Sequence, residues 1–324
     1  MSLISIIMPV YNAEKTVEKS IDSIINQTCG NWELVAVDDG SKDSSAAILE
    51  KYAKEHSNIR YFCQTNAGPG AARNLAISEA IGDYIAFLDS DDWWEPDFIE
   101  RINKEVDTAS PDVIFYDLIR ERENGDPLGV SKISAFSSCS RRDLIRYQMT
   151  GKLEWGMVKV IRRSIIADNG LVFSSDSVGE EAIFSYSVLC HSEVIKFIDK
   201  PMYHYVMFDN GQHKKGNNDP WNRVVSNMKK HLVSIGAFDE YEATVNSFAI
   251  KALSISCYRI SISESYGEAK KLINAKIDEY CENYSLDLIE ADTLDRVTRI
   301  LRIFIRSRFI LPIYLASKIR KRGR

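Results

Sequence analysis

The sequence predicts an α/β fold, in which a mixed, mainly parallel sheet is flanked by helices and followed by a C-terminal helical extension. Three observations support this prediction. Short apolar runs alternate with helical apolar stripes over about the first ninety residues, the pattern of a doubly wound sheet. Each of four apolar runs ends in a polar cluster. The composition then shifts towards helix-forming residues near Gly216.

The alternation defines the first elements of the chain. Apolar residues at helical spacing predict helices at residues 14–27, 44–56 and 71–81. The strands between them are predicted at residues 2–10, 32–37, 59–63 and from residue 84 onwards. Ligands of such sheets bind outside the carboxyl ends of the strands, where the strand order reverses. The polar clusters expected at that edge are Tyr11-Asn12, Asp38-Asp39, Asn66 and Asp89 to Asp92.

After about residue 110 the alternation of predicted strands and helices is less regular. Strands are predicted at residues 111–120, 194–198 and 203–207, and a polar loop at 174–181 precedes a helix at 182–190. The boundary near Gly216 divides the chain into an α/β domain, residues 1–215, and a mostly helical domain, residues 216–324. The loop at residues 209–218, rich in Gly, Asn and Lys, is either a mobile lid or an interdomain linker.

Composition narrows the class of protein. The chain has 324 residues, of which 45% are hydrophobic and 27% are charged, as in globular proteins. Its net charge of −5 argues against non-specific binding to nucleic acid. Its six scattered cysteines form no CxxC pair, and the sequence shows no signal peptide, so we expect reduced thiols in the cytoplasm. No apolar run approaches the roughly 20 residues that span a bilayer.

Three carboxylates follow the fourth strand within four residues: Asp89, Asp91 and Asp92. Left unpaired, they would repel one another. Mn²⁺ or Mg²⁺ prefers such oxygen ligands, completed by water and phosphate. The alternative is an acidic turn that merely ends the strand, and this motif alone does not decide between the two.

Four motifs, in this order, resemble those of family 2 glycosyltransferases of the GT-A fold. They are Pro9-Val10-Tyr11-Asn12, Val37 to Ser41, Asn66-x-Gly68 with Ala72-Arg73-Asn74, and Phe87 to Asp92. The resemblance extends from Ile4 to Met207 and is to bacterial enzymes of capsule, exopolysaccharide or lipopolysaccharide synthesis. It implies a Rossmann-like GT-A catalytic domain. It also implies metal-dependent, inverting transfer of a hexose or N-acetylhexosamine from a UDP-sugar to a saccharide acceptor, often a lipid-linked one.

The resemblance gives the first two motifs a role in binding the nucleotide. Pro9 and Tyr11 would belong to the nucleotide-sugar site. Tyr11 would pack against the uracil ring, and Asp39 would accept a hydrogen bond from uracil N3–H. The alternatives are an ordinary aromatic residue at a strand end and a turn carboxylate bonded to backbone amides. Of the two aspartates in the second motif, Asp38 suits that structural role better.

The third and fourth motifs would complete the donor site. Asn66 and Gly68 would shape the pocket wall, with simple turn chemistry as the alternative. Arg73 would reach the base or a phosphate, unless it is a solvated helix charge. In the fourth motif, the direct metal ligand would be Asp91, and Asp89 would contact the ribose or the metal through water. Ser90 would belong to the nucleotide-sugar site, and Asp92 would be a supporting acid. Trp93 and Trp94 would either wall the acceptor site or belong to the core.

The family places its general base at an Asp of a Glu-Asp pair that starts a helix. The matching pair here is Glu180-Glu181, so Glu181 maps to the base and Glu180 to a supporting acid. The alternative is that both acids merely favour a helix N-terminus. A single base implies inversion by direct displacement. His204 is a candidate further ligand of the metal or phosphate, with a structural histidine as the alternative.

The C-terminal tail has the pattern of a basic amphipathic helix. One predicted face is apolar, with Leu294, Val297, Leu301 and Phe304, and another carries arginines at 296, 299, 302 and 306. Such a helix suits an anionic membrane surface, which would place the protein peripherally on the inner face of the cell membrane. The alternatives are a helix packed on the rest of the protein and a homodimer contact.

Two other functions remain open on the sequence. A sugar- or nucleotide-binding scaffold of the same fold that lost catalysis would explain why Glu181 replaces an aspartate. A nucleotidyltransferase of related fold would carry a Gly-rich loop with Lys or Arg after the first strand, and the sequence lacks it. UDP release from a UDP-sugar separates these functions from glycosyl transfer.

Overall fold

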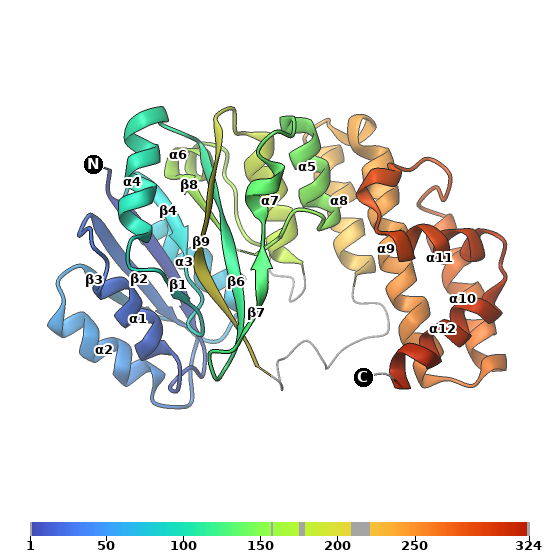
Figure 1. The fold of residues 1–324 in the computed structure, drawn as a ribbon, viewed down its shortest axis with the longest axis horizontal. Coiled ribbons are helices and arrows are strands. Elements are labelled where there is room, and N and C mark those ends of the chain that lie inside the picture. The colour runs from blue at the N-terminus through green and yellow to red at the C-terminus, as the bar shows by residue number, and fades with distance from the viewer. Residues whose placement is uncertain (1, 157, 175–178, 209–220, 323–324) are drawn as a thin grey trace. The chain divides into compact units, whose positions relative to one another are not determined.

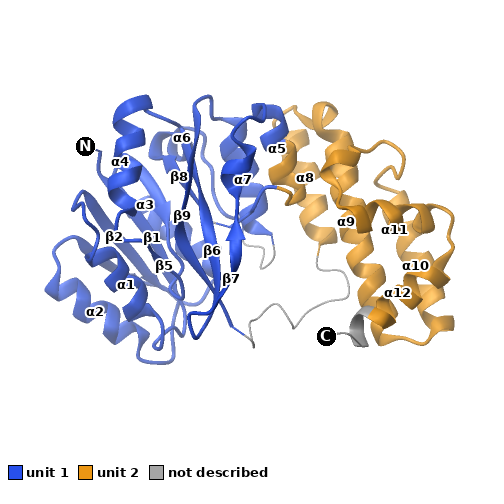
Figure 2. Cartoon of the chain, viewed as in Figure 1, with its two compact units in different colours: residues 1–145, 153–211 blue, residues 146–152, 212–324 orange. Residues whose placement is uncertain are grey.

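The computed structural model describes residues 2–156, 158–174, 179–208 and 221–322. The chain divides into two compact units: residues 1–145 with 153–211, and residues 146–152 with 212–324 (Figure 2). The expected boundary at Gly216 and the candidate lid at residues 209–218 lie outside the described residues. Residues 146–152, which the sequence assigned to the first domain, group with the second unit.

The first unit begins with four adjacent parallel strands in the order β3-β2-β1-β4 (Figure 1). These strands are β1 (Ile4–Val10), β2 (Trp32–Asp38), β3 (Ile59–Cys63) and β4 (Tyr84–Phe87). The helices that connect them are α1 (Val17–Ile25), α2 (Ser45–Glu55) and α3 (Pro69–Glu79). β1, β2 and β4 are almost wholly buried, which explains their continuous apolar sequences. The predicted alternation is confirmed.

Strand order fixes the position of the ligand-binding edge. β1 lies between β2 and β4, because the chain winds outwards from β1 to β3 and then returns to the other side of β1. The carboxyl ends of all four strands therefore meet at one edge, with the reversal of strand order between β1 and β4. The predicted polar clusters leave the sheet at this edge.

The other half makes the sheet mixed. β8 (Lys159–Arg162) runs antiparallel between β4 and β6 (Val113–Arg122), and β9 (Ile195–Met207) lies parallel to β6. Two shorter strands pair antiparallel at the periphery, β5 (Trp93–Trp94) with β9 and β7 (Pro127–Ser131) with β6. This arrangement confirms the predicted α/β fold. The remaining elements are α4 (Phe98–Ala109), η1 (Ile133–Phe136), α5 (Arg141–Thr150), α6 (Arg163–Asp168) and α7 (Glu180–Cys190).

Two predicted elements differ from the structure. The strands expected at 194–198 and 203–207 are one strand, β9, whose register against β6 shifts near Asp117, opposite Pro201. Proline has no N–H to donate, so a local irregularity lets a single strand continue through it. In addition, α7 begins at Glu180, two residues before the predicted start, after Gly179 with φ of 77°.

The second unit is helical, as predicted. Its central helix is α9 (Phe238–Ser263), which is buried on most sides because four other helices pack on it. They are α8 (Asn222–Ser234), α10 (Tyr266–Cys281), α11 (Arg296–Arg306) and α12 (Ile310–Arg322), with a short η3 (Ala291–Thr293) before α11. None of the helices in these described parts of the chain is both long and apolar enough to cross a membrane.

The apolar face predicted for the tail is partly wrong. Leu294 is buried, but Val297 is 59% exposed. The side of α11 that packs on the unit is instead marked by Thr298 and Ile305, which are buried. The exposed side of α11 consequently carries the apolar residues Val297, Ile300 and Ile303.

Candidate active site

The loops after β1 and β2 are joined by hydrogen bonds at the carboxyl edge. The side-chain oxygen of Asn12 accepts a hydrogen bond from Lys42 N at 2.8 Å, and Asn12 N donates to Ser41 Oγ at 3.0 Å. Asn12 has φ of 50°, a left-handed conformation that asparagine tolerates better than most residues. Tyr11, which precedes it, is 41% exposed at this edge, so one of its surfaces is open to a ligand.

Asp39 fixes the turn after β3. Its carboxylate accepts hydrogen bonds from Ala67 N at 2.8 Å, Gly68 N at 2.9 Å and Gln64 Nε2 at 2.7 Å. We expected the structural role for Asp38, which does accept a bond from Ser41 N, but both aspartates bind backbone amides. The turn therefore depends on Asp39, whatever else this carboxylate binds.

The same turn places the third motif. Gly68 has φ of 91°, a conformation that favours glycine, and it immediately precedes α3. Asn66 is exposed beside it, and Arg73 follows in the second turn of the helix. The geometry of the turn thus determines where the guanidinium of Arg73 lies.

Arg73 is the centre of an acidic cluster. It is only 3% exposed, and its Nη2 lies 2.9 Å from Asp89 Oδ1 and 3.2 Å from Glu181 Oε1. Its Nη1 lies 3.6 Å from Glu180 Oε1. The expected solvated or outward-reaching arginine is thus a buried bridge between the fourth motif and the start of α7. Sequence positions 73, 89 and 181 meet at one guanidinium.

Three carboxylates around one cation leave excess negative charge. Burial alone would lower the pKa of Arg73, but the charges of Asp89, Glu181 and Glu180 raise it overall. Burial and the nearby Glu181 raise the pKa of Glu180 to about 7. Burial also raises the pKa of Glu181, although 30% of its side chain stays accessible and Arg73 acts in the opposite direction. A carboxyl group with a raised pKa is a better proton acceptor than a free one.

A buried lysine that the sequence reasoning did not single out lies behind the pair. Lys159 in β8 is fully buried, and its Nζ donates to Ser185 Oγ at 2.8 Å and to the carbonyls of Trp155 at 3.3 Å and Gly156 at 3.0 Å. Burial lowers its pKa to about 7, although Glu181 attracts its charged form. Because Ser185 lies one turn after Glu181, Lys159 fixes the part of α7 that carries the carboxylate. The sequence signal that could have revealed Lys159 is a lysine directly before the apolar pair Val160-Ile161.

Residues of α3 also hold the segment that leads into α7. Asn74 makes two hydrogen bonds with the backbone of Phe173, from Nδ2 to the carbonyl at 2.8 Å and from the amide to Oδ1 at 2.9 Å. A Cβ on Gly70 would lie 3.0 Å from the Ser174 carbonyl oxygen, so glycine permits this close approach. The sequence predicted a motif here but gave Asn74 no role of its own.

The acids of the fourth motif lie in different environments. Asp92 is buried and accepts hydrogen bonds from Tyr203 Oη at 2.5 Å and Val206 N at 2.8 Å. Asp91 is exposed, and within the described residues no side chain pairs with its carboxylate. Protein atoms nevertheless crowd that carboxyl group, and this desolvation, followed by the charge of Asp89, raises its pKa to about 6. Asp91 is thus the acid available to a ligand, with Ser90 half-buried beside it.

The aromatic residues after the motif are mostly structural. Trp94 is 1% exposed and stacks on Phe98, with ring centroids 3.8 Å apart, which favours the core alternative for this residue. Trp93 stacks on His204 with centroids 3.4 Å apart. Both ring nitrogens of His204 bind carboxylates, Nδ1 at 3.0 Å from Glu121 and Nε2 at 2.9 Å from Glu95. This geometry favours the structural alternative for His204.

The acids of this site suit a metal ion whose coordination is completed by a bound substrate. Nowhere in the described parts of the chain do three or more His, Cys, Asp or Glu side chains form a group that could hold a metal by themselves. Asp91, whose carboxylate has no side-chain partner within the described residues, lies two positions after Asp89. Mg²⁺ and Mn²⁺ sites commonly use one or two carboxylates and complete their coordination with substrate phosphates and water. The residues therefore fit such an ion in the presence of a diphosphate.

Comparison with known proteins agrees with this geometry. The profile of the family described as "Glycosyl transferase family 2" matches residues 5–169. The chain is 31% identical over 207 residues to the putative glycosyltransferase EpsH of Bacillus subtilis. That match spans 62% of this chain and 60% of EpsH.

Solved structures share the fold. TarS residues 1–349 from S. aureus, in complex with UDP-GlcNAc, match with a TM-score of 0.73 and 21% identity over 99% of this chain and 92% of that one. A mannosyltransferase from Pyrobaculum calidifontis, in complex with GDP-Man and Mn²⁺, matches with a TM-score of 0.53 and 14% identity over 98% and 86%. The arrangement is of the GT-A type, and the chain belongs to glycosyl transferase family 2.

Proposed function

We propose that the protein is a metal-dependent, inverting glycosyltransferase that moves a hexose or N-acetylhexosamine from a UDP-sugar to a saccharide acceptor. The observation that carries this proposal is the bridge at Arg73, which holds Asp89 of the donor motif and Glu181 of α7 on one guanidinium. Activation of an acceptor hydroxyl requires a carboxylate held close to the bound donor. The UDP-GlcNAc complex of TarS supports a uridine nucleotide as the donor carrier.

The donor would lie along the carboxyl edge. Uracil would pack on the exposed ring of Tyr11, two residues after Pro9, and its N3–H would donate a hydrogen bond to Asp39. Asp39 Oδ2 accepts one amide hydrogen bond, from Gly68, and a carboxylate oxygen can accept two. Asn66 and Gly68 would form the wall, with the ribose and diphosphate near Asp89 and Ser90.

Mn²⁺ or Mg²⁺ would be held by Asp91, with Asp89 as a second contact, and would neutralise charge on the leaving diphosphate. The protein's own contribution is to keep Asp91 free of cationic partners while Arg73 neutralises Asp89. The Mn²⁺ in the archaeal mannosyltransferase complex supports this assignment of the ion.

Glu181 would perform the proton transfer. It accepts the proton of the acceptor hydroxyl as that oxygen attacks the anomeric carbon. The bond from this carbon to the diphosphate oxygen breaks on the opposite face, which inverts the configuration. Glu180 would remain a supporting acid, since it is buried and its pKa of about 7 keeps it largely protonated below neutrality. Arg73 and Lys159 would then hold Glu181 in its charged form.

Metal dependence provides the direct test. We expect UDP release from UDP-sugars to be lost in EDTA and restored by Mn²⁺. The Asp91→Asn substitution should weaken metal affinity by about 10–100-fold, because one of few ligands loses its charge. A UDP-sugar panel, followed by UDP release and thermal shift with Mn²⁺, would make both measurements. Binding without turnover would instead support the scaffold alternative, and metal-independent turnover would remove the ion from the proposal.

Lys159 provides a second test, as a positioning residue. Lys159→Met should lower kcat by about tenfold with little change in the donor KM, since it loosens α7 without touching the donor. It should also move the acid limb of the pH–rate profile to higher pH, because Lys159 lowers the pKa of Glu181 in the parent. Lys159→Arg should recover part of the rate. An unshifted profile with a lower rate would indicate only a structural role.

We further propose a lipid-linked saccharide acceptor in surface-polysaccharide synthesis, met at the inner face of the cell membrane. The exposed apolar residues of α11 support this, because Ile300 and Ile303 lie among Arg296, Arg299 and Arg306 on the accessible side of the helix. Ile303→Glu should reduce cosedimentation with anionic vesicles severalfold. If it instead converts a dimer to a monomer in size-exclusion chromatography, the apolar residues form a homodimer contact.

A further inference from the structure

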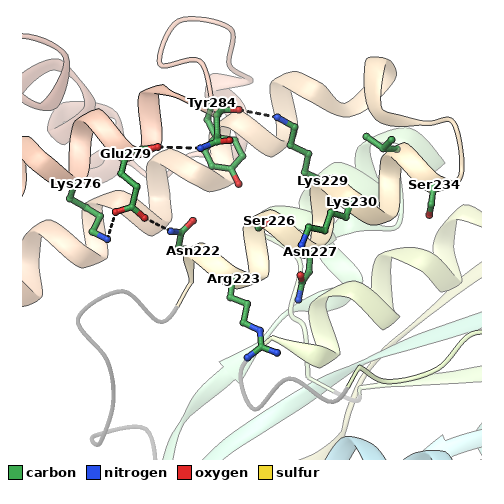
Figure 3. A pocket seen from close by; sticks show the side chains of 12 residues that line it. Asn222, Arg223, Ser226, Asn227, Lys229, Lys230, Ser234, Lys276, Glu279 and Tyr284 are labelled. Atoms are coloured by element: carbon green, nitrogen blue, oxygen red, sulfur yellow. Dashed lines mark hydrogen bonds and ion pairs between the residues drawn. The ribbon is translucent and has the colours of Figure 1, made fainter.

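A second polar site lies in the helical unit, between α8 and α10 (Figure 3). It is a groove with a volume of about 1100 Å³. Its walls carry four cationic side chains and one acid, in a chain whose net charge is −5. The cations are Arg223, Lys229, Lys230 and Lys276, and the acid is Glu279.

The acid does not cancel the positive field of the groove. Glu279 lies 2.6 Å from Lys276 Nζ and accepts a hydrogen bond from Asn222 at 2.7 Å, so its charge is already satisfied (Figure 3). Lys229 reaches across to the end of α10, where it donates to the Asn283 carbonyl at 3.1 Å. These contacts hold the two helices together. Arg223 and Lys230 are the exposed cations of the α8 wall.

The spacing along α8 fits a repeating anion rather than one isolated phosphate. Arg223 and Lys230 are seven residues apart, which places them on the same side of the helix and about 10 Å apart along its axis. Between them the groove is lined by Ser226 and Asn227. A hydroxyl and an amide group between two cations suit a ligand chain that carries both hydroxyl and anionic groups.

Two other polyanionic partners fit the lining less well. A membrane surface needs protruding apolar anchors, but this groove is concave, and its exposed apolar lining is Val233. Single-stranded nucleic acid needs aromatic platforms for its bases, whereas the aromatic lining residue, Tyr284, lies beneath Lys229 Nζ, 5.5 Å from the ring centroid. The lining is mostly amide, hydroxyl and ammonium groups.

We propose that the groove between α8 and α10 binds an anionic saccharide chain, one that carries carboxylate or phosphodiester groups along its length. The cations would pair with the anions, and the asparagine and serine side chains would bind sugar hydroxyls. All of its lining residues belong to the helical unit, and binding there does not depend on glycosyl transfer.

The test measures binding by the full chain. Fluorescently labelled oligogalacturonate serves as the carboxylated saccharide, and a neutral malto-oligosaccharide and polyphosphate serve as comparisons. We expect salt-sensitive binding of oligogalacturonate, weaker binding of polyphosphate and none of the neutral chain. The double variant Arg223→Glu/Lys230→Glu should weaken oligogalacturonate binding at least tenfold, because it replaces two charge-assisted contacts with repulsion.

The matched control is Lys270→Glu/Lys271→Glu, which makes the same charge change at exposed positions of α10 outside the groove lining. It should leave binding within about twofold of the parent, since distant exposed charges are screened. Equal loss in both variants would overturn the proposal and indicate non-specific attraction. If the groove variant reduced binding to phosphatidylglycerol vesicles and left oligogalacturonate binding unchanged, the groove would be a membrane contact.

Asp91→Asn keeps the two proposals distinguishable. This variant should bind oligogalacturonate as the parent does, even though its UDP release is impaired. Loss of chain binding in Asp91→Asn would mean that the saccharide binds at the donor edge, and the groove proposal would be wrong.

Discussion

Replacing Glu181 by glutamine should lower the rate of glycosyl transfer by about 10²–10⁴-fold, the usual contribution of a positioned general base. Glutamine keeps the size of the side chain and a hydrogen-bond acceptor for Arg73, but it cannot take the acceptor proton. Donor binding should be nearly unchanged, because the carboxylate acts on the acceptor side of the reaction. Initial rates of UDP release and thermal shift with UDP and Mn²⁺ measure the two effects separately.

Two further variants make this result specific. Glu181→Asp keeps a carboxylate at this position, so it should be at least tenfold more active than Glu181→Gln. Glu123→Gln makes the same chemical change at an exposed position in the turn between β6 and β7, and should behave as the parent. If Glu181→Gln kept more than about a tenth of the parent rate, Glu181 would not be the base.

Replacing Arg73 by methionine should destabilise the first unit by about 3–5 kcal/mol near neutral pH, because the substitution leaves buried carboxylates without their cation. The loss should grow as the pH rises. Burial already raises the pKa of Glu180 and Glu181 in the folded state. Removing the guanidinium raises these pKa values further. The folded variant then keeps protons on these groups up to a higher pH than the unfolded chain does, so its stability falls as the pH rises through that range.

Urea unfolding of the parent and Arg73→Met at pH 5, 7 and 8 would measure this trend. Arg101→Met is the control, since it removes an exposed arginine whose Nε lies 2.6 Å from Asp97, and it should cost less than about 1 kcal/mol at any pH. A loss in Arg73→Met that is the same at pH 5 and pH 8 would show that packing, rather than charge, explains the effect.

The carboxyl edge of the sheet, where we propose that the donor binds, was the most predictable part of the protein. Strand ends are local features, and parallel strands must share an edge, so the positions of Tyr11, Asp39 and Asp89 follow from pattern and topology. The internal contacts of that edge were less predictable. Sequence reasoning favoured Asp38 over Asp39 for binding turn amides, but both carboxylates can reach such amides and both do so in the structure.

Contacts between segments that lie far apart in the sequence could mostly not be predicted from the sequence. Arg73 was expected to reach the base or a phosphate, or else to be a solvated helix charge. Only the tertiary structure shows that it is a buried bridge between Asp89 and Glu181. Lys159 carried no motif at all, and its role depends on Ser185 and two backbone carbonyls, which it meets through tertiary structure. Likewise, the apolar stripe of α11 did not reveal which side would pack, so Val297 was assigned to the wrong one.

The sequence by itself determined the α/β alternation, the order of the motifs and which residues are candidates for binding a metal, a nucleotide and a proton. These properties depend on local propensity, periodicity and functional groups, which each residue carries with it. The tertiary structure alone decided which charges are buried together, which acid stays free and where cations gather between α8 and α10. Burial and neighbouring charge set the pKa values and the pairing of these groups, and both depend on residues that are far apart in the chain.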